Sequence, residues 1–277
     1  MDSDEEENYF ISVTDLMTGV VFIFVILLVT YSITFHEAEK KLAREKELHG
    51  LSTSEIAKAE QKAKDYQKQL AQEISQNRVK AEKMDSLAKL LRDREERRRA
   101  VLLDTVTRLN KRGVKVTLDN DNGIIRLPEE LLFDPGQASL RPEAALPLAV
   151  LAEELKQLLG RWCDPAEDFR LEALFIEGHT DSIPIHTDMF ANNWALSTSR
   201  AVNVSGALTE SQPDIKAYLN PSGMPVLGVS GYGENRPVAD NSTKEERRKN
   251  RRIDLRFLLA YPTAEQMQKA TAGFAPQ

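Results

Sequence analysis

The sequence predicts a protein with a single N-terminal transmembrane helix, a helical linker and a C-terminal α/β domain in which helices cover a mixed sheet. Three observations predict this order. Residues 16–35 carry no charge, a proline-free stretch rich in Lys, Glu, Arg, Gln and Ala follows, and alternating apolar residues and turn signals begin near Gly113. At 277 residues, the chain is long enough for one ordinary domain of roughly 100–200 residues and for extended architecture beside it.

The composition excludes several classes of function. With 37 Lys+Arg against 43 Asp+Glu, the chain has no strongly basic field, so we expect no direct nucleic-acid partner. One cysteine, Cys163, permits neither an intramolecular disulfide nor a cysteine-based zinc site. Since the sequence also lacks a nucleophile elbow, a phosphate loop and a supported pair of catalytic carboxylates, we expect neither an enzyme nor a cofactor.

The first element is the predicted transmembrane helix, which we place at residues 9–35 after an acidic tail at residues 1–8. The uncharged run matches the length that crosses a hydrocarbon core about 30 Å thick, and residues 9–14 extend it on the N-terminal side. A cleaved signal peptide has a basic start, a shorter apolar core and a small-residue cleavage site. This chain begins with acidic residues, so we expect the span to be retained as an anchor.

Asp15 is the most informative residue of the span, because the uncharged residues before it place it about two turns inside the helix. An unpaired carboxylate at membrane depth costs roughly 2.5–3.5 kcal/mol, so such residues usually serve ion transfer or pairing. Ser12, Thr18 and Gly19 lie three or four residues away and form a small, polar face that another membrane helix can approach closely. The alternative is that the span starts at Leu16 and Asp15 caps it.

The second element is a helical linker over residues 36–112. We expect a break at His49-Gly50, and a capping box in which Ser52 and Glu55 restart the helix. Apolar residues then recur at three- and four-residue steps from Ile56 to Leu91 and form one narrow stripe. Two interpretations stay open: a coiled coil with a partner helix, or a solvated single helix that acts as a spacer.

The third element is an α/β domain over residues 113–262, followed by a C-terminal tail at 263–277. A strand pair joined by the Asn122-Gly123 turn opens the domain. Further elements follow in order: a helix at 142–159, a buried strand at 171–177, a helix at 196–208, and strands at 226–229 and 253–259. This order predicts a mixed sheet with helices on one face.

Four short motifs lie in the predicted domain, and further matching residues occur at 133–142. The motifs are Gly178-His179-Thr180-Asp181, residues 193–201 (NWALSTSRA), Gly231-Tyr232-Gly233-Glu234 and Asn250-Arg251-Arg252-Ile253. Together they resemble the OmpA-type peptidoglycan-binding family over about residues 113–262, which implies an OmpA-like fold for the C-terminal domain.

The resemblance also implies a binding site for the peptidoglycan stem peptide. Matched by motif position, Asp181 would take the ammonium and Arg200 the carboxylate of the zwitterionic diaminopimelate end, a pairing that suits both groups. Asn193 and Arg252 match positions that line or support that pocket. The alternative is a structural salt bridge between Asp181 and Arg200. The His and Asp residues near these motifs do not form a complete ligand set, so we expect no metal.

A membrane helix with an acidic residue near its start, a helical linker and an OmpA-type domain together resemble the B subunits of flagellar-type stators, the MotB family. Residues 9–19 (YFISVTDLMTG) look closer to the ZorB branch, found in the Zorya anti-phage defence system. Flagellar members typically carry a basic N-terminus and a tryptophan shortly before the aspartate, and this chain has neither.

The resemblance to this family implies an ion-driven complex. Asp15 would be the ion-translocating carboxylate, protonated and released as protons or sodium ions pass, while Ser12, Thr18 and Gly19 would face the partner. The implied partners are a multi-span, ZorA-like A subunit in a complex of five A and two B subunits, a second copy of this chain, and, indirectly, cytoplasmic effectors.

Orientation is the point at which two sequence signals disagree. The resemblance places the protein in the bacterial inner membrane, with its N-terminus in the cytoplasm and its C-terminal domain in the periplasm. Lys40, Lys41 and Arg44 follow the span and no Lys or Arg precedes it, which alone predicts the reverse orientation. We follow the resemblance, because a partner subunit also sets orientation. A flagellar-type stator subunit and a passive OmpA-type envelope tether without ion flux are the alternative functions.

Overall fold

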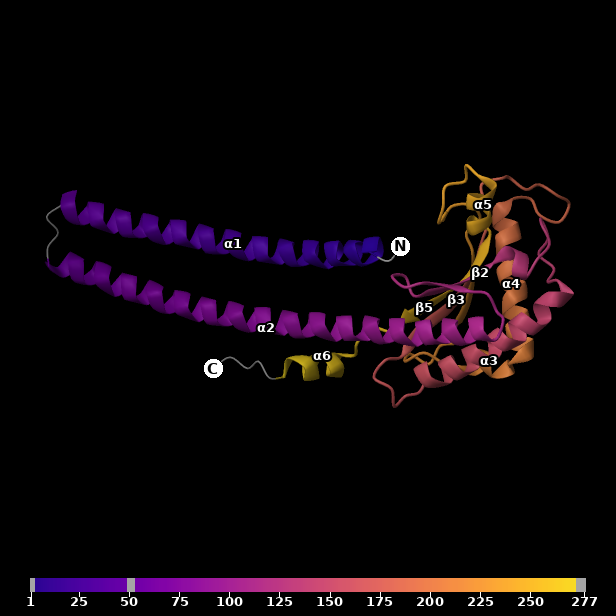
Figure 1. Cartoon of the computed structure of the whole chain (residues 1–277). Helices are drawn as coiled ribbons and strands as arrows, with labels where there is room; N and C mark the ends of the chain where they lie inside the picture. The colour runs from indigo at the N-terminus through magenta and orange to yellow at the C-terminus, as the bar shows by residue number, and fades with distance from the viewer. Residues whose placement is uncertain (1–2, 49–52, 273–277) are drawn as a thin grey trace. The chain divides into compact units, whose positions relative to one another are not determined.

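The computed structural model describes the backbone of residues 3–48 and 53–272, and the side chains of residues 19–46 and 55–272 (Figure 1). The chain separates into an N-terminal unit, Met1–Lys80, and a larger C-terminal unit that begins at Ala81. The N-terminal apolar helix, the long helical linker and the C-terminal domain with a mixed sheet are all present, so the predicted fold class is confirmed.

Helix α1 (Ser3–Leu48) contains the predicted transmembrane segment. The most apolar 18-residue window within Gly19–Lys46 has a mean hydropathy of 2.2, none of that window is buried, and the helix is long and apolar enough to cross a membrane. The large apolar side chains at residues 20–29 are each 46–64% exposed. This helix is therefore not the core helix of a folded domain, and its apolar surface lacks a covering within the described part of the chain.

The backbone of α1 also decides how Asp15 is placed. An N-cap residue has a non-helical backbone and precedes the first helical turn, whereas Asp15 lies within a helix that starts at Ser3. Asp15 therefore does not have the backbone of an N-cap, and the depth of Asp15 in a membrane stays a prediction. Because the backbone is helical throughout, Ser12, Thr18 and Gly19 share a face with Asp15.

Helix α2 (Thr53–Lys111) is 59 residues long and forms most of the predicted linker. The expected break at His49-Gly50 and the cap at Ser52 lie outside the described residues. Several side chains of the predicted apolar stripe are exposed, with Tyr66 70%, Ile74 57% and Met84 68% accessible, whereas others, such as Leu70 and Leu87, are half-buried. This exposure fits both interpretations of the stripe, the coiled coil and the spacer.

The last turns of α2 belong to the C-terminal unit. Leu102, Val106 and Leu109 are at most 7% exposed and lie in its hydrophobic core. The helix ends at Lys111, Gly113 follows with a φ of 86° that suits glycine, and the Val114 amide donates to the Leu109 carbonyl at 3.0 Å. The linker helix thus runs without interruption into the domain that we expected to start at residue 113.

The sheet of the C-terminal unit has five strands in the order β1-β2-β5-β3-β4. The strands are β1 (Thr117–Asp119), β2 (Ile124–Pro128), β3 (Leu171–His179), β4 (Leu227–Gly231) and β5 (Arg252–Leu259). Strands β3 and β4 are parallel and the other neighbouring pairs are antiparallel. The β1–β2 turn uses Gly123 at a φ of 63°, as the Asn-Gly sequence predicts.

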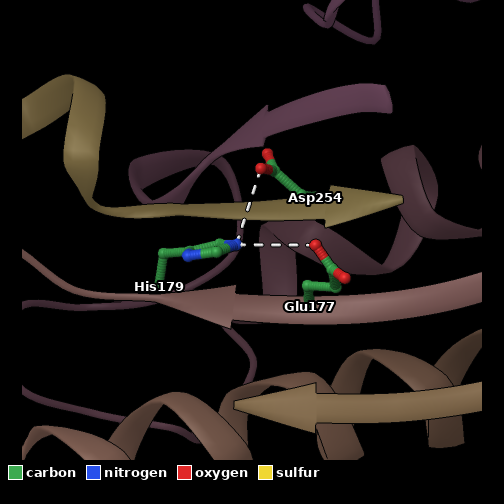
Figure 2. Close-up of side chains that lie close together, drawn as sticks. All are labelled: Glu177, His179 and Asp254. Atoms are coloured by element: carbon green, nitrogen blue, oxygen red, sulfur yellow. Dashed lines mark ion pairs between the residues drawn. The ribbon is translucent and has the colours of Figure 1, made fainter. Parts of the chain in front are cut away.

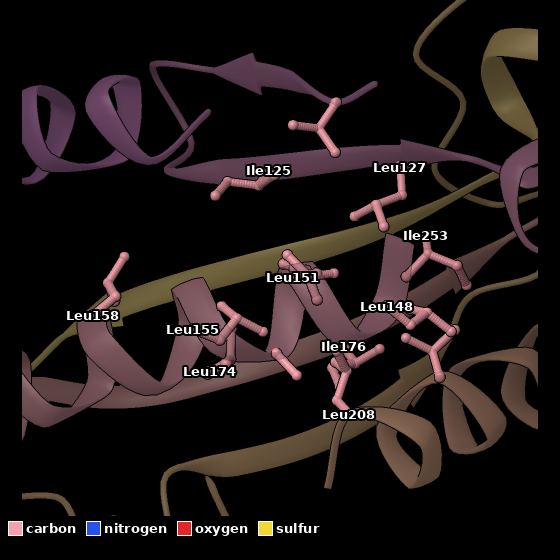
Figure 3. Packing of buried hydrophobic residues seen from close by; sticks show 14 of the residues in the cluster. Ile125, Leu127, Leu148, Leu151, Leu155, Leu158, Leu174, Ile176, Leu208 and Ile253 are labelled. Atoms are coloured by element: carbon pink, nitrogen blue, oxygen red, sulfur yellow. The ribbon is translucent and has the colours of Figure 1, made fainter. Parts of the chain in front are cut away.

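Helices α3 (Ala145–Trp162) and α4 (Asn193–Ser211) pack on one face of this sheet (Figure 3). Alternate side chains of the central strands, such as Leu174, Ile176 and Leu255, meet Leu151 and Leu155 of α3, and all five are fully buried. The remaining elements are short: η1 (Glu129–Leu131), η2 (Pro142–Ala144), η3 (Pro213–Ala217), α5 (Lys244–Asn250) and α6 (Ala264–Thr271).

Candidate functional site

The first turns of α4 lie directly against strands β3 and β4, and two glycines make this possible. A Cβ on Gly178 would lie 2.0 Å from the Ser197 carbonyl oxygen, and one on Gly231 would lie 2.1 Å from Thr198 Oγ1. Both distances are far below contact, so only glycine fits. The Gly233 amide then donates to Ser197 Oγ at 3.0 Å. The glycine motifs of the sequence therefore fix where α4 begins.

A cavity of about 270 Å³ opens beside this junction, at the carboxyl end of β3. Asp181, Asn193 and Arg200 all line it, so the structure brings together three of the four predicted binding residues. Asn193 Nδ2 donates to the Ile183 carbonyl at 3.1 Å and to the Asp181 carbonyl at 3.4 Å. Asn193 thus holds the loop that carries Asp181 against the start of α4.

Arg200 is bound from several sides and is only 2% exposed. Its Nη2 donates to Glu129 Oε1 at 2.6 Å, its Nε donates to the Gln137 carbonyl at 2.8 Å, and its guanidinium lies 5.2 Å from the centre of the Phe133 ring. Burial raises the pKa of Glu129 and lowers the pKa of Arg200, although each charge partly offsets the shift of the other. A buried, oriented guanidinium of this kind suits a carboxylate ligand.

Arg251 connects the two acidic residues of the pocket. Its Nη1 lies 2.7 Å from Asp181 Oδ2 and its Nε lies 2.8 Å from Glu129 Oε2, while its side chain is 30% exposed. Asp181 therefore pairs with Arg251, and the described residues show no ion pair between Asp181 and Arg200. The alternative of a structural Asp181–Arg200 salt bridge is wrong.

The structure does not bring Arg252 to this pocket. Arg252 is 5% exposed, its Nε lies 2.9 Å from Asp254 Oδ2, and its other nitrogens donate to the carbonyls of Asn250 and Arg236. Side chains alternate along a strand, so Arg252, the first residue of β5, shares a face with Asp254, whereas Arg251 precedes the strand as the C-cap of α5. For Arg251 and for Glu129, the two residues that sequence reasoning missed, we find no local signal.

Behind Arg252, the sheet face opposite α3 and α4 carries a second buried cluster (Figure 2). His179 Nε2 lies 3.5 Å from Asp254 Oδ2 and 3.9 Å from Glu177 Oε2, and each of the three residues is 1% exposed. The ligand atoms of the three residues lie within 4.8 Å of one another, a spacing that a metal ion could bridge.

Neighbouring arginines argue against a cation in this cluster. Arg256 holds both oxygens of Glu177 at 2.9 Å, and Arg252 holds Asp254 at 2.9 Å. Burial, followed by the charges of four arginines, lowers the pKa of His179 to about 2. The same positive potential opposes a divalent cation. We therefore propose no metal there.

Comparison with known proteins matches this unit to a family. Residues 132–251 fit the model of the OmpA family. The C-terminal domain is OmpA-like. Over 145 residues, the chain is 35% identical to Motility protein B of Bacillus subtilis, covering 52% of this chain and 48% of that protein. It is 32% identical over 143 residues to the probable lipoprotein YiaD of Escherichia coli, covering 52% of this chain and 54% of that protein.

The chain thus spans about half the length of these relatives. Among solved structures, a MotB-like protein from Desulfovibrio vulgaris is 26% identical, with a TM-score of 0.46, and the match covers 62% of this chain and 99% of that one. The cell wall anchor of the T6SS from Pseudomonas aeruginosa is 23% identical, with a TM-score of 0.44, and covers 57% and 97%. At TM-scores below 0.5, these structures add nothing to the assignment of the OmpA-like domain.

Proposed function

We propose that this chain is the peptidoglycan-anchored B subunit of an ion-driven stator complex in the bacterial inner membrane, and that it acts in anti-phage defence. The observation that carries the proposal is the presence, on one chain, of an apolar helix with an internal aspartate and of an OmpA-like domain with a zwitterion-sized charged pocket. The first supplies an ion carrier and the second an anchor.

The pocket suits the diaminopimelate end of a stem peptide because it offers both charges at close range. Asp181 and Glu129 present carboxylates for an ammonium, and Arg200 and Arg251 present guanidinium groups for a carboxylate. Arg251 is the most exposed of the paired groups, so an incoming ammonium can replace its contact with Asp181 while Arg251 turns to the carboxylate. Asn193 keeps the Asp181 loop in place.

Cosedimentation of the full chain, in detergent micelles, with purified peptidoglycan sacculi tests this part. Asp181→Asn removes the charge with little change in shape, and we expect binding to fall by at least about tenfold, as expected for loss of a charge-assisted contact of roughly 1.5–3 kcal/mol. Asp188→Asn is the matched control, because Asp188 is exposed in the same loop and does not line the pocket. Equal binding of wild type and Asp181→Asn would contradict the assignment.

Asp15 is proposed as the ion-carrying carboxylate. Its place inside the continuous helix α1, beside Ser12, Thr18 and Gly19, supports a partner helix that approaches closely and pairs with or hydrates the carboxylate. We propose a multi-span, ZorA-like A subunit as that partner, with five A and two B subunits, and protons or sodium as the ion. A passive tether would leave Asp15→Asn silent in every assay.

The cellular role and the orientation need separate experiments. Expressed together with its A-type partner, the chain should lower phage plaque counts and should not restore swimming to cells that lack a flagellar stator B subunit; restored swimming would favour the flagellar alternative, to which the Bacillus subtilis relative points. In spheroplasts, external protease should digest the OmpA-like domain. Protection of that domain would place it in the cytoplasm and would overturn the proposal.

A further inference from the structure

A second cavity lies next to the binding pocket, between strands β1 and β2 and helix α5. It measures about 580 Å³, and its charged lining is strongly basic. The cationic side chains are Lys115, Arg126, Arg248, Lys249, Arg251 and Arg252, against the single carboxylate of Glu245. We call this cavity the basic groove.

The arginines of the basic groove already have acidic partners. Arg126 lies 2.5 Å from Asp119, Arg252 lies 2.9 Å from Asp254, and Arg248 pairs with Glu130. These ion pairs fix the walls of the groove and neutralise much of their charge.

The two lysines differ from the arginines. Lys115 precedes β1 and Lys249 lies on α5, both side chains are exposed, and neither has an ion-pair partner among the residues that the structure describes. Two ammonium groups from different elements therefore face one groove with only Glu245 to balance them. This arrangement favours an anionic ligand.

Arg251 joins the basic groove to the binding pocket, because it lines both cavities. On the pocket side it contacts Asp181 and Glu129. A ligand whose zwitterionic end lies against Asp181 and Arg200 can therefore extend past Arg251 into the groove. Tethering raises the effective concentration of a second charged group there, so even exposed ammonium groups can add affinity.

We propose that the basic groove is a second subsite for the wall peptide, in which Lys115 and Lys249 bind a further carboxylate of the same stem peptide. This inference rests on the proposed function of the pocket. A stem peptide offers that carboxylate from two sources, the α-carboxylate of its D-glutamate residue and its C-terminal carboxylate. The chemistry of recognition is the same for both.

Calorimetric titration of the full chain, in detergent micelles, with a diaminopimelate-containing muropeptide tests the subsite. The double variant Lys115→Gln/Lys249→Gln should bind roughly 3- to 10-fold more weakly, as expected for two exposed ion pairs. Lys244→Gln is the matched control, because this exposed lysine lies on the same helix α5 but does not line the groove. It should bind as the wild type does.

Two modified peptides identify the carboxylate. One carries an amide in place of the D-glutamate α-carboxylate, and the other carries an amide at its C-terminus. The peptide that lacks the recognised carboxylate should bind the wild type more weakly by the same factor as the double variant binds the unmodified peptide. Its affinity for the double variant should not fall further. If both amidated peptides bind the wild type with unchanged affinity, the subsite is excluded.

The outcomes separate this inference from the proposed function. If Asp181→Asn abolishes binding while the double lysine variant binds as the wild type does, the pocket stands and the subsite fails. If the wild type does not bind the muropeptide at all, both fail.

Discussion

Helix α1 and strand β3 are both rich in large apolar residues, but these residues are exposed in α1 and buried in β3. Leu171, Leu174 and Ile176 of β3 are fully buried under α3 and α4. The apolar side chains at residues 20–29 of α1 are 46–64% exposed. The OmpA-like domain thus buries its own apolar side chains, whereas those of α1 are exposed within the described part of the chain. In the proposed function, lipid and a partner helix cover the apolar surface of α1.

The largest effect that tests this contrast is a core truncation. Leu155→Ala removes a fully buried side chain of α3, and we expect the domain to lose about 2–5 kcal/mol of unfolding free energy. Ile26→Ala truncates a side chain of α1 that is 49% exposed, and should change the unfolding of the domain by less than about 0.5 kcal/mol. Urea unfolding of the full chain in micelles, followed by tryptophan fluorescence, measures both. Similar losses of unfolding free energy in the two variants would contradict the difference between the buried core and the exposed helix α1.

A second prediction concerns the close approach of α4 to the sheet. Gly178→Ala places a Cβ 2.0 Å from the Ser197 carbonyl oxygen, so backbone must move, and we expect a loss of about 1–3 kcal/mol or more. Gly206→Ala, within helix α4 itself, adds a Cβ that has nothing within 4 Å, and this variant should stabilise the domain by about 0.4–1 kcal/mol. The same unfolding assay compares them, and a harmless Gly178→Ala would contradict the packing that positions the pocket.

A third prediction addresses where the linker becomes part of the domain. Arg94 is 4% exposed, and its guanidinium donates to the carbonyls of Asp168 and Ala260. Arg94→Ala should therefore cost about 1.5–3 kcal/mol. Arg97→Ala removes an exposed neighbour whose guanidinium lies 4.4 Å from the centre of the Phe169 ring, and should cost about 0.5–1 kcal/mol. Hydrogen exchange should show α2 opening near Arg94 only in the first variant. Equal protection in both would place the domain boundary later in the chain.

A fourth prediction concerns the pH dependence of the unfolding free energy. The pKa of His179 is lowered to about 2 by burial and by neighbouring arginines, from an ordinary value of 6.5. Below pH 6.5 the His179 side chain binds a proton in the unfolded chain but stays neutral in the folded domain. The unfolding free energy therefore falls as the pH falls from about 6.5 toward 2. In His179→Gln, the slope of unfolding free energy between pH 6 and pH 4 should flatten by up to about 1.4 kcal/mol per pH unit. An unchanged slope would show that His179 titrates normally.

Much of the fold could be predicted because its signals are local. The uncharged run of α1, the Asn122-Gly123 turn and the apolar periodicity of α3 each depend on residues close in sequence. The start of the C-terminal unit within α2 could not be predicted in this way. Leu102, Val106 and Leu109 continue the helical pattern of the linker, and only their contacts with the sheet make them core residues.

Part of the binding pocket could be predicted, because some of its residues lie in motifs whose local structure follows from the sequence. Asp181, Asn193 and Arg200 are fixed by glycines and a helix start that the sequence displays. Arg251 was missed because the motif contains two adjacent arginines, and only the folded structure shows that Arg251 contacts Asp181 while Arg252 contacts Asp254. Glu129 lies more than fifty residues before Asp181, and its role arises from the β2–β5 pairing, where Pro128 is opposite Arg252.

The most direct test of the proposed function is ion flux in inverted membrane vesicles that contain the full chain and the proposed A-type partner. We predict that Asp15→Asn abolishes ion flux while sacculus binding stays at the wild-type level. Asp181→Asn should instead lower sacculus binding. Flux through the Asp15→Asn complex at the wild-type rate would contradict the central claim that the carboxylate in α1 carries the ion.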